Sequence, residues 1–245
     1  MKYIQTSILK ILGVAAFLFG AIGTHAQTPA ELLQKADSLF IKKQFTQSFE
    51  VYQRVHNRGQ YSPAMFLKMA FIQEGLNKPG LALYYLNLYY LASGDDQTLV
   101  KMEELAAKNK LYGYENTPIV QARELVTRYR PFAAAGIAAI ILLLMAIAVY
   151  QARKGTRPVA VVVLAILGLI FLGLFVNFSA PPQTAIIASN NTFVMAGPSS
   201  GASVVGLLTE GHKVEIKDKE DVWLKVYWAD KFAYVRQSQV LEITL

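Results

Sequence analysis

Two long uncharged runs dominate the hydropathy pattern of this chain. They cover residues 131–150 and 159–178 and contain no Asp, Glu, Lys or Arg. A helix rises about 1.5 Å per residue, so a run of about twenty residues can cross a hydrocarbon core of about 30 Å. The alternative, two buried helices of a soluble domain, fits a chain of this size poorly. The pattern therefore predicts a transmembrane helical hairpin whose two helices are joined by a loop at 151–158.

Residues 27–110, which precede these runs, carry apolar side chains at spacings of three and four, as amphipathic helices do. The pattern matches itself when it is shifted by 34 residues, so that Ala36 falls on Ala70. Four further pairs follow the same shift: Leu32 with Phe66, Ser48 with Ala82, Tyr52 with Leu86, and Val55 with Tyr89. The period and the alternation of small and large residues resemble the tetratricopeptide repeat (TPR), in which small residues such as Ala36, Ala70 and Ala82 let paired helices approach.

The resemblance covers two repeats, 29–62 and 63–96, and implies a stack of helix pairs with a concave face. A further helix is expected over 97–110, where it would cover the second repeat. Residues 111–130 are expected to connect this domain to the first apolar run. An unrelated stack of helical hairpins is the alternative, because three positions depart from the family pattern. These positions are Lys35, Gln60 and Pro79.

Four tyrosines lie close together in the second repeat, between Tyr84 and Tyr90. Tyr85 and Tyr89 are four residues apart and therefore share one side of a helix. We predict that this pair lines a groove that binds an extended or helical segment of a partner protein. The alternative interpretation is that these side chains belong to the core and to surface close to the membrane.

Residues 184–245 contain short runs of β-forming residues between turn signals, after a linker at 179–183. Six short strands are predicted, which fits a compact barrel with a thin core. The strand at 223–228 alternates clearly and begins with Trp223, whose large ring is expected to pack into that core.

Four ordered motifs in this segment are similar to the bacterial SH3 domain. They are VMAGPS at 194–199, VVGLLTEG at 204–211, WLKV at 223–226 and AYV at 233–235. The resemblance implies a small SH3-like β-barrel. Met195 stands where the family has arginine, and Ala233-Tyr234 stands where it has glycine and tryptophan, so the ligand stays open.

The first 26 residues have the pattern of a signal peptide. Lys2 and Lys10 form a positively charged region before a short apolar stretch at 11–22. Thr24-His25-Ala26 then forms a small-x-small cleavage site. An uncleaved anchor is the alternative, and either one places the following residues outside the cytoplasm. The chain contains no cysteine, so the exported domains are expected to hold together by packing, without disulfides.

The formal net charge of +7 does not indicate binding to nucleic acid, because much of the excess lies in the signal peptide and in the 151–158 loop. Arg153, Lys154 and Arg157 favour a cytoplasmic loop under the positive-inside rule. Three arginines between 123 and 130 weaken this argument, so the sidedness depends on the signal peptide. Both soluble parts are then expected on the periplasmic side of a bacterial inner membrane.

No motif assembles a catalytic, metal or cofactor site. Of the three histidines, His25 lies in the signal peptide, while His56 and His212 fall in different predicted domains. A cysteine nucleophile is impossible, and neither a nucleophile elbow nor a phosphate-binding glycine loop is present. We therefore expect a protein that is not an enzyme and carries no metal or cofactor; an enzyme is the remaining alternative.

The order of the parts resembles the BatE-type proteins of bacterial aerotolerance operons. The expected fold class is a multidomain α + β membrane protein with α-helical TPR-like repeats, a transmembrane helical hairpin and a small SH3-like β-barrel. The resemblance implies an envelope scaffold whose repeats bind a protein, with von Willebrand A-type membrane proteins as partners. The alternative is an envelope protein that binds peptidoglycan through the SH3-like domain.

Overall fold

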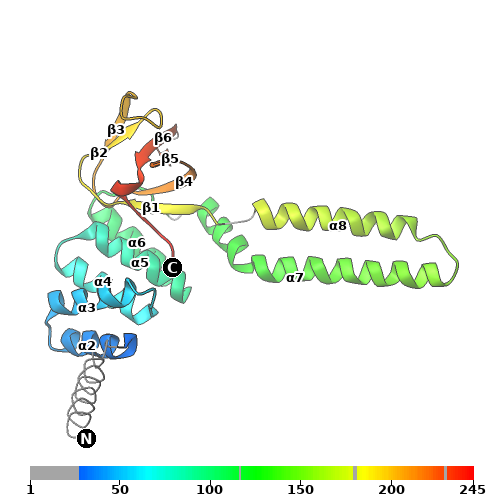
Figure 1. The fold of residues 1–245 in the computed structure, drawn as a ribbon, viewed down its shortest axis with the longest axis horizontal. Helices are drawn as coiled ribbons and strands as arrows, with labels where there is room; N and C mark the ends of the chain where they lie inside the picture. Colours follow the sequence, from blue (N-terminus) through cyan, green and yellow to red (C-terminus); the bar gives the residue numbers. More distant parts are fainter. Residues whose placement is uncertain (1–27, 116, 179–180, 229–230) are drawn as a thin grey trace, which may run out of the picture. The chain divides into compact units, whose positions relative to one another are not determined.

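The computed structural model describes residues 28–115, 117–178, 181–228 and 231–245. The predicted signal peptide, residues 1–26, lies outside the described residues, and so do residues 179–180 of the predicted linker. The chain divides into two compact units, Met1–Ile72 and Gln73–Leu245. Figure 1 shows the helices and strands that make up these units.

Three helical segments form the described part of the first unit: α2 (Pro29–Ile41), α3 (Phe45–His56) and most of α4 (Pro63–Gly75). Thr28 begins α2 with a capping box, because its hydroxyl accepts from the Glu31 N–H and the Glu31 carboxylate accepts from the Thr28 N–H, both at 3.2 Å. The Ser48 hydroxyl in α3 donates to the Ala36 carbonyl in α2 at 2.8 Å. Small side chains therefore hold the two helices close together.

A buried tyrosine adds a polar anchor to this helix pair. The Tyr52 hydroxyl in α3 donates to the Asp37 carboxylate in α2, and the Lys68 ammonium group lies 2.7 Å from the same carboxylate. Burial, followed by the hydrogen bond to Asp37, raises the pKa of Tyr52 above its ordinary value. The phenol therefore stays protonated and remains a donor at neutral pH.

Four helices lie in the second unit in addition to the end of α4: α5 (Pro79–Ser93), α6 (Gln97–Lys108), α7 (Pro118–Arg153) and α8 (Val159–Phe178). The helices α4 and α5 begin 34 residues after α2 and α3, which is the predicted period. Ala36, Ala70 and Ala82 are all buried, as predicted for the small contact positions. The helices predicted for the two TPR-like repeats, and the additional helix after them, are thus present at the expected spacing.

The helices α7 and α8 are long and apolar enough to cross a membrane, by length and composition. They run side by side in Figure 1. They pack tightly at Gly168, where a Cβ atom would lie 3.0 Å from Ile141 Cγ1. The first helix is longer than the predicted span, because it begins at Pro118 and contains Pro131 within it. Proline has no N–H to donate, so Pro131 interrupts the helical hydrogen bonds, and the ribbon of α7 bends in Figure 1.

The last part of the chain forms a seven-stranded antiparallel sheet in the order β3-β2-β6-β5-β4-β1-β7. Strands from both ends of this order contribute to one core, since Leu208 of β3 and Val240 of β7 belong to the same buried cluster. The sheet therefore curls around its core, as predicted for a small barrel. Its elements are β1 (Gln183–Ile187), β2 (Thr192–Met195), β3 (Val204–Leu208), β4 (Lys213–Glu220), β5 (Trp223–Trp228), β6 (Lys231–Arg236), the 3-10 turn η1 (Gln237–Gln239) and β7 (Val240–Glu242).

The sequence predicted six of these strands and missed β7. This strand has only three residues and no alternating pattern, and it is defined by its pairing with β1. Trp223 is 7% exposed and lies in the barrel, as predicted. The register shifts between Ile216 and Asp218 in β4 show where the sheet departs from regular pairing to bend.

Candidate binding sites

A joint within the second unit fixes the segment between α6 and α7 to the barrel. The Tyr112 N–H donates to His212 Nδ1 at 3.1 Å, and the Tyr112 carbonyl accepts from the Lys213 N–H at 3.0 Å. The two rings of Tyr112 and His212 stack with centroids 5.5 Å apart and an interplanar angle of 7°. The buried Tyr114 hydroxyl donates to the Gly211 carbonyl at 2.8 Å. We call residues 112–114 and 211–213 the joint.

The joint requires a glycine and encloses a charge. Gly113 has a φ of +93°, and a Cβ atom there would lie 2.3 Å from the Lys213 carbonyl oxygen, so no larger residue fits. The Lys213 ammonium group donates to Asn87 Oδ1 of α5 at 2.9 Å. Desolvation lowers the pKa of Lys213 to about 8, although the negative charge of Glu124 acts in the opposite direction. Sequence reasoning assigned no role to these residues.

A neutral histidine completes the joint. Desolvation lowers the pKa of His212 below its ordinary value, which keeps the ring uncharged at neutral pH. This state suits the contact, because an unprotonated Nδ1 is needed to accept the Tyr112 N–H. Packing and hydrogen bonds therefore hold the joint together.

The two tyrosines predicted to line a partner groove have different surroundings. Tyr85 is only 4% exposed and packs edge-on against Tyr84, with ring centroids 5.1 Å apart. The alternative interpretation, a core residue, therefore describes Tyr85. Tyr89 is half-buried, and its hydroxyl donates to Asp95 Oδ2 at 3.2 Å. Binding of a partner by this pair stays a prediction.

The first unit displays an aromatic cluster that sequence reasoning did not single out. Phe40, Phe45 and Phe71 meet edge to face, with centroid separations of 5.5, 5.7 and 5.8 Å. Phe71 is 57% exposed, and the neighbouring Ile41 is also exposed. The Lys68 ammonium group lies 5.8 Å from the centre of the Phe40 ring. These features make an apolar surface with the Lys68–Asp37 ion pair beside it, which is suited to a partner segment.

The barrel carries a shallow groove of about 360 Å³. Trp223 is one of its lining residues, and the Arg236 guanidinium lies 5.3 Å from the centre of the Trp223 ring and donates to the Ser200 hydroxyl. Exposed Phe193 and Val204 flank it. Aromatic and aliphatic side chains beside a cation and a hydroxyl can bind a short peptide or sugar by apolar contact and hydrogen bonding. The remaining lining residues are Met195 and Gln239.

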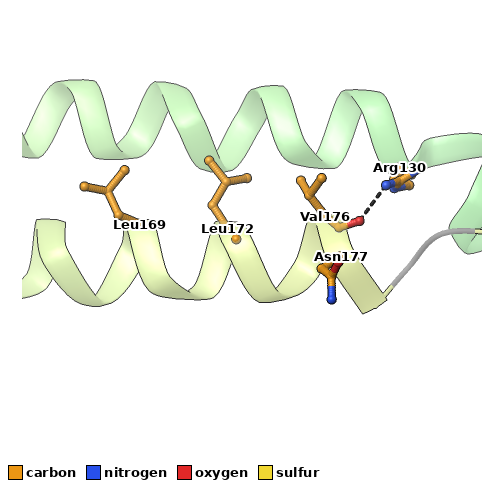
Figure 2. Close-up of a pocket in the computed structure, with 6 residues that line it drawn as sticks. Arg130, Leu169, Leu172, Val176 and Asn177 are labelled. Carbon is orange, nitrogen blue, oxygen red and sulfur yellow. Dashed lines mark hydrogen bonds between the residues drawn. The ribbon is translucent and has the colours of Figure 1, made fainter.

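A second groove, of about 680 Å³, lies on the pair of apolar helices. Figure 2 shows Leu169, Leu172 and Val176 reaching from α8 toward α7, with Arg130 of α7 at one end. The Arg130 Nη2 donates to the Val176 carbonyl at 2.5 Å. The groove is thus lined by apolar residues of α8, and its polar lining residues are Arg130 and Asn177.

Within the part of the chain that the structure describes, no group of three or more His, Asp or Glu side chains is placed to hold a metal ion. The expectation that the protein is not an enzyme is not tested by this arrangement and stays a prediction.

Residues 190–241 match the sequence model of the family described as the bacterial SH3 domain. The match begins before β2 and ends within β7, so the predicted SH3-like domain is confirmed for that segment. One similar solved structure is described as YrrB, a TPR protein with an unusual peptide-binding site. Its sequence is 15% identical to this chain, and the TM-score is 0.32. The alignment covers 72% of this chain and 88% of that chain. A likeness this weak supports no argument about binding. A search of curated proteins finds no match.

Proposed function

We propose that this protein is a non-enzymatic, membrane-anchored scaffold of the bacterial envelope that binds a protein partner through its TPR-like domain. The observation that carries the proposal is the aromatic cluster of Phe40, Phe45 and Phe71, because a helical repeat that leaves a large apolar ring exposed offers a binding surface. The bacterial SH3 domain at 190–241 favours an envelope location. Partner contacts at Tyr89 belong to the same proposal.

The anchoring arrangement follows from the two apolar helices and the joint. Residues 112–114 precede the hairpin in the chain and residues 211–213 follow it, yet they contact one another. This contact supports the placement of both soluble parts on one side of the membrane. The signal-peptide pattern makes that side the periplasm, with the 151–158 loop in the cytoplasm.

The partner follows from the resemblance to BatE-type proteins. On this basis the repeats bind a von Willebrand A-type membrane protein in an aerotolerance-type complex. A second candidate function, binding of peptidoglycan, is favoured by the groove at Trp223 and Arg236, because aromatic and apolar side chains beside a cation suit a glycan or a stem peptide.

Co-purification separates these two functions. The full chain carrying Phe71→Glu is purified from membranes in mild detergent, beside Phe193→Glu at the barrel groove and Leu91→Glu as a matched control on another exposed site. All three substitutions place the same charge on an exposed apolar position, and circular dichroism checks that each variant folds. We expect Phe71→Glu alone to lose the partner proteins. Loss with Phe193→Glu instead, together with lost sedimentation with cell-wall sacculi, would support the peptidoglycan function.

A further inference from the structure

The groove on the helices α7 and α8 exists because the helices pack closely at one level and leave space at another. At Gly168 a Cβ atom would lie 3.0 Å from Ile141 Cγ1, whereas at Gly173 it would meet nothing within 4 Å. Gly173 lines the groove, so the missing side chain helps to form it. The other apolar lining residues lie at helical spacing along the same face of α8, and they are Leu169, Leu172 and Val176.

The groove ends at an arginine with donors to spare. Arg130 donates to the Val176 carbonyl, which lies in the last turn of α8, where carbonyl groups lack helical partners. Arginine has five N–H donors, and this is the one hydrogen bond found for Arg130 within the described residues. The neighbouring arginines are used differently, since Arg128 pairs with Asp96 and Arg123 lies 3.8 Å from Glu215.

Arg130 lies at the end of the apolar run, where an inserted helix would reach the surface of the bilayer. It directly precedes the uncharged run at 131–150, and the exposed rings of Tyr129 and Phe132 stand on either side of it in the sequence. Aromatic residues favour the interface between hydrocarbon and headgroups, and an arginine there keeps its charge in contact with water. The end of α8 carries a partial negative charge of about half a unit, which the full charge of Arg130 exceeds.

We propose that this groove binds one anionic glycerophospholipid, with its phosphate on Arg130 and one acyl chain along Leu169, Leu172 and Gly173. The planar guanidinium matches two phosphate oxygens at once. The groove from Leu169 to Val176 extends about 10 Å along the helix axis, which accommodates part of an acyl chain. Zwitterionic lipids add a cationic group that Arg130 repels, so the site prefers a lipid with net negative charge. This inference rests on the proposed insertion of the hairpin into a membrane.

Lipid retention tests the proposal on the full chain. The protein is reconstituted into vesicles of equal parts phosphatidylglycerol and phosphatidylcholine, extracted in mild detergent, and the retained lipids are quantified by native mass spectrometry. We expect the wild type to retain phosphatidylglycerol about tenfold over phosphatidylcholine, which corresponds to about 1.4 kcal/mol. Arg130→Gln should abolish this preference. Arg153→Gln removes the same charge at the other end of the hairpin and should leave the preference unchanged.

A second pair of variants tests where the acyl chain lies. Gly173→Leu fills the groove and should reduce retention of phosphatidylglycerol about tenfold. Gly136→Leu is the matched control, because a Cβ atom there also meets nothing within 4 Å and Gly136 does not line the groove. Full retention by Gly173→Leu would overturn the acyl-chain placement. Displacement of the lipid by excess inorganic phosphate would show a site for free anions instead of a lipid.

Resistance to alkaline extraction from the vesicles is measured for every variant. This measurement distinguishes a failure of the proposed membrane anchoring from a failure of the proposed lipid site. A wild-type chain that does not insert contradicts membrane anchoring itself. A chain that inserts but retains both lipids equally, or an Arg130→Gln variant that keeps the preference, contradicts the lipid site alone.

Discussion

Replacing Tyr114 with Phe should destabilise the barrel although the residue lies outside it. The substitution removes only the hydroxyl, which donates to the Gly211 carbonyl at 2.8 Å. Both residues are buried, so water cannot replace the lost donor. A buried polar group left without its partner costs about 1–3 kcal/mol. We therefore expect the free energy of unfolding of the barrel to fall by about 2 kcal/mol.

Tryptophan fluorescence reports this change selectively. The chain has two tryptophans, Trp223 and Trp228, and both lie in β5 of the barrel. Urea unfolding of the full chain in mild detergent can therefore be followed without a signal from the helices. For a urea dependence near 2 kcal/mol per M, a loss of about 2 kcal/mol lowers the midpoint by about 1 M.

Tyr234→Phe is the matched control. It removes the same hydroxyl, but this one donates to the exposed Glu220 at 3.2 Å, where water can substitute. Its effect should stay within about 0.5 kcal/mol. Equal, small shifts for the two variants would refute the reasoning, because they would mean that the joint contributes nothing to the stability of the barrel.

Three further predictions concern Trp223, Lys213 and the topology of the chain. Trp223→Ala should cost about 3–5 kcal/mol and unfold the barrel, as seen by loss of cooperative urea unfolding followed through the remaining tryptophan; an unchanged midpoint would contradict its place in the core. The free energy of unfolding should rise as pH increases from about 8 to 10.5, because the unfolded chain still binds the proton that folded Lys213 has released. Urea titrations at several pH values measure this rise, and Lys213→Gln should flatten it. Single cysteines at Ser93 and Ser238 should react with an impermeant thiol reagent on spheroplasts, whereas one at Thr156 should not. Labelling of Thr156→Cys alone would contradict the proposed topology.

Local patterns predicted the elements of this fold well. The shift that pairs Ala36 with Ala70 depends on residues within each helix pair, and the helices begin at the same spacing. Trp223 was placed correctly because a large ring in a short alternating strand has few other positions. The strand β7 was missed, since pairing with β1 rather than its own composition makes it a strand.

The candidate binding sites were harder to predict from the sequence than the helices and strands. Apolar residues occupy nearly every side of α5, so periodicity could not show that Tyr85 points into the core. The joint brings Tyr112 to His212 across 100 residues, and neither segment carries a motif. The groove beside Arg130 depends on how two helices pack, which an uncharged run does not encode. In each case the missing information was a contact between distant segments rather than a local preference.

The separation of the two halves of the joint also sets an order of events during synthesis. Residue 112 leaves the ribosome 100 residues before His212. At about 5–20 residues per second, roughly 5–20 s pass before the second half exists. During that interval Tyr114 and Asn87 have no barrel to contact. In a chain that stops before the barrel is complete, Tyr114 and Asn87 would therefore lack their hydrogen-bond partners, Gly211 and Lys213.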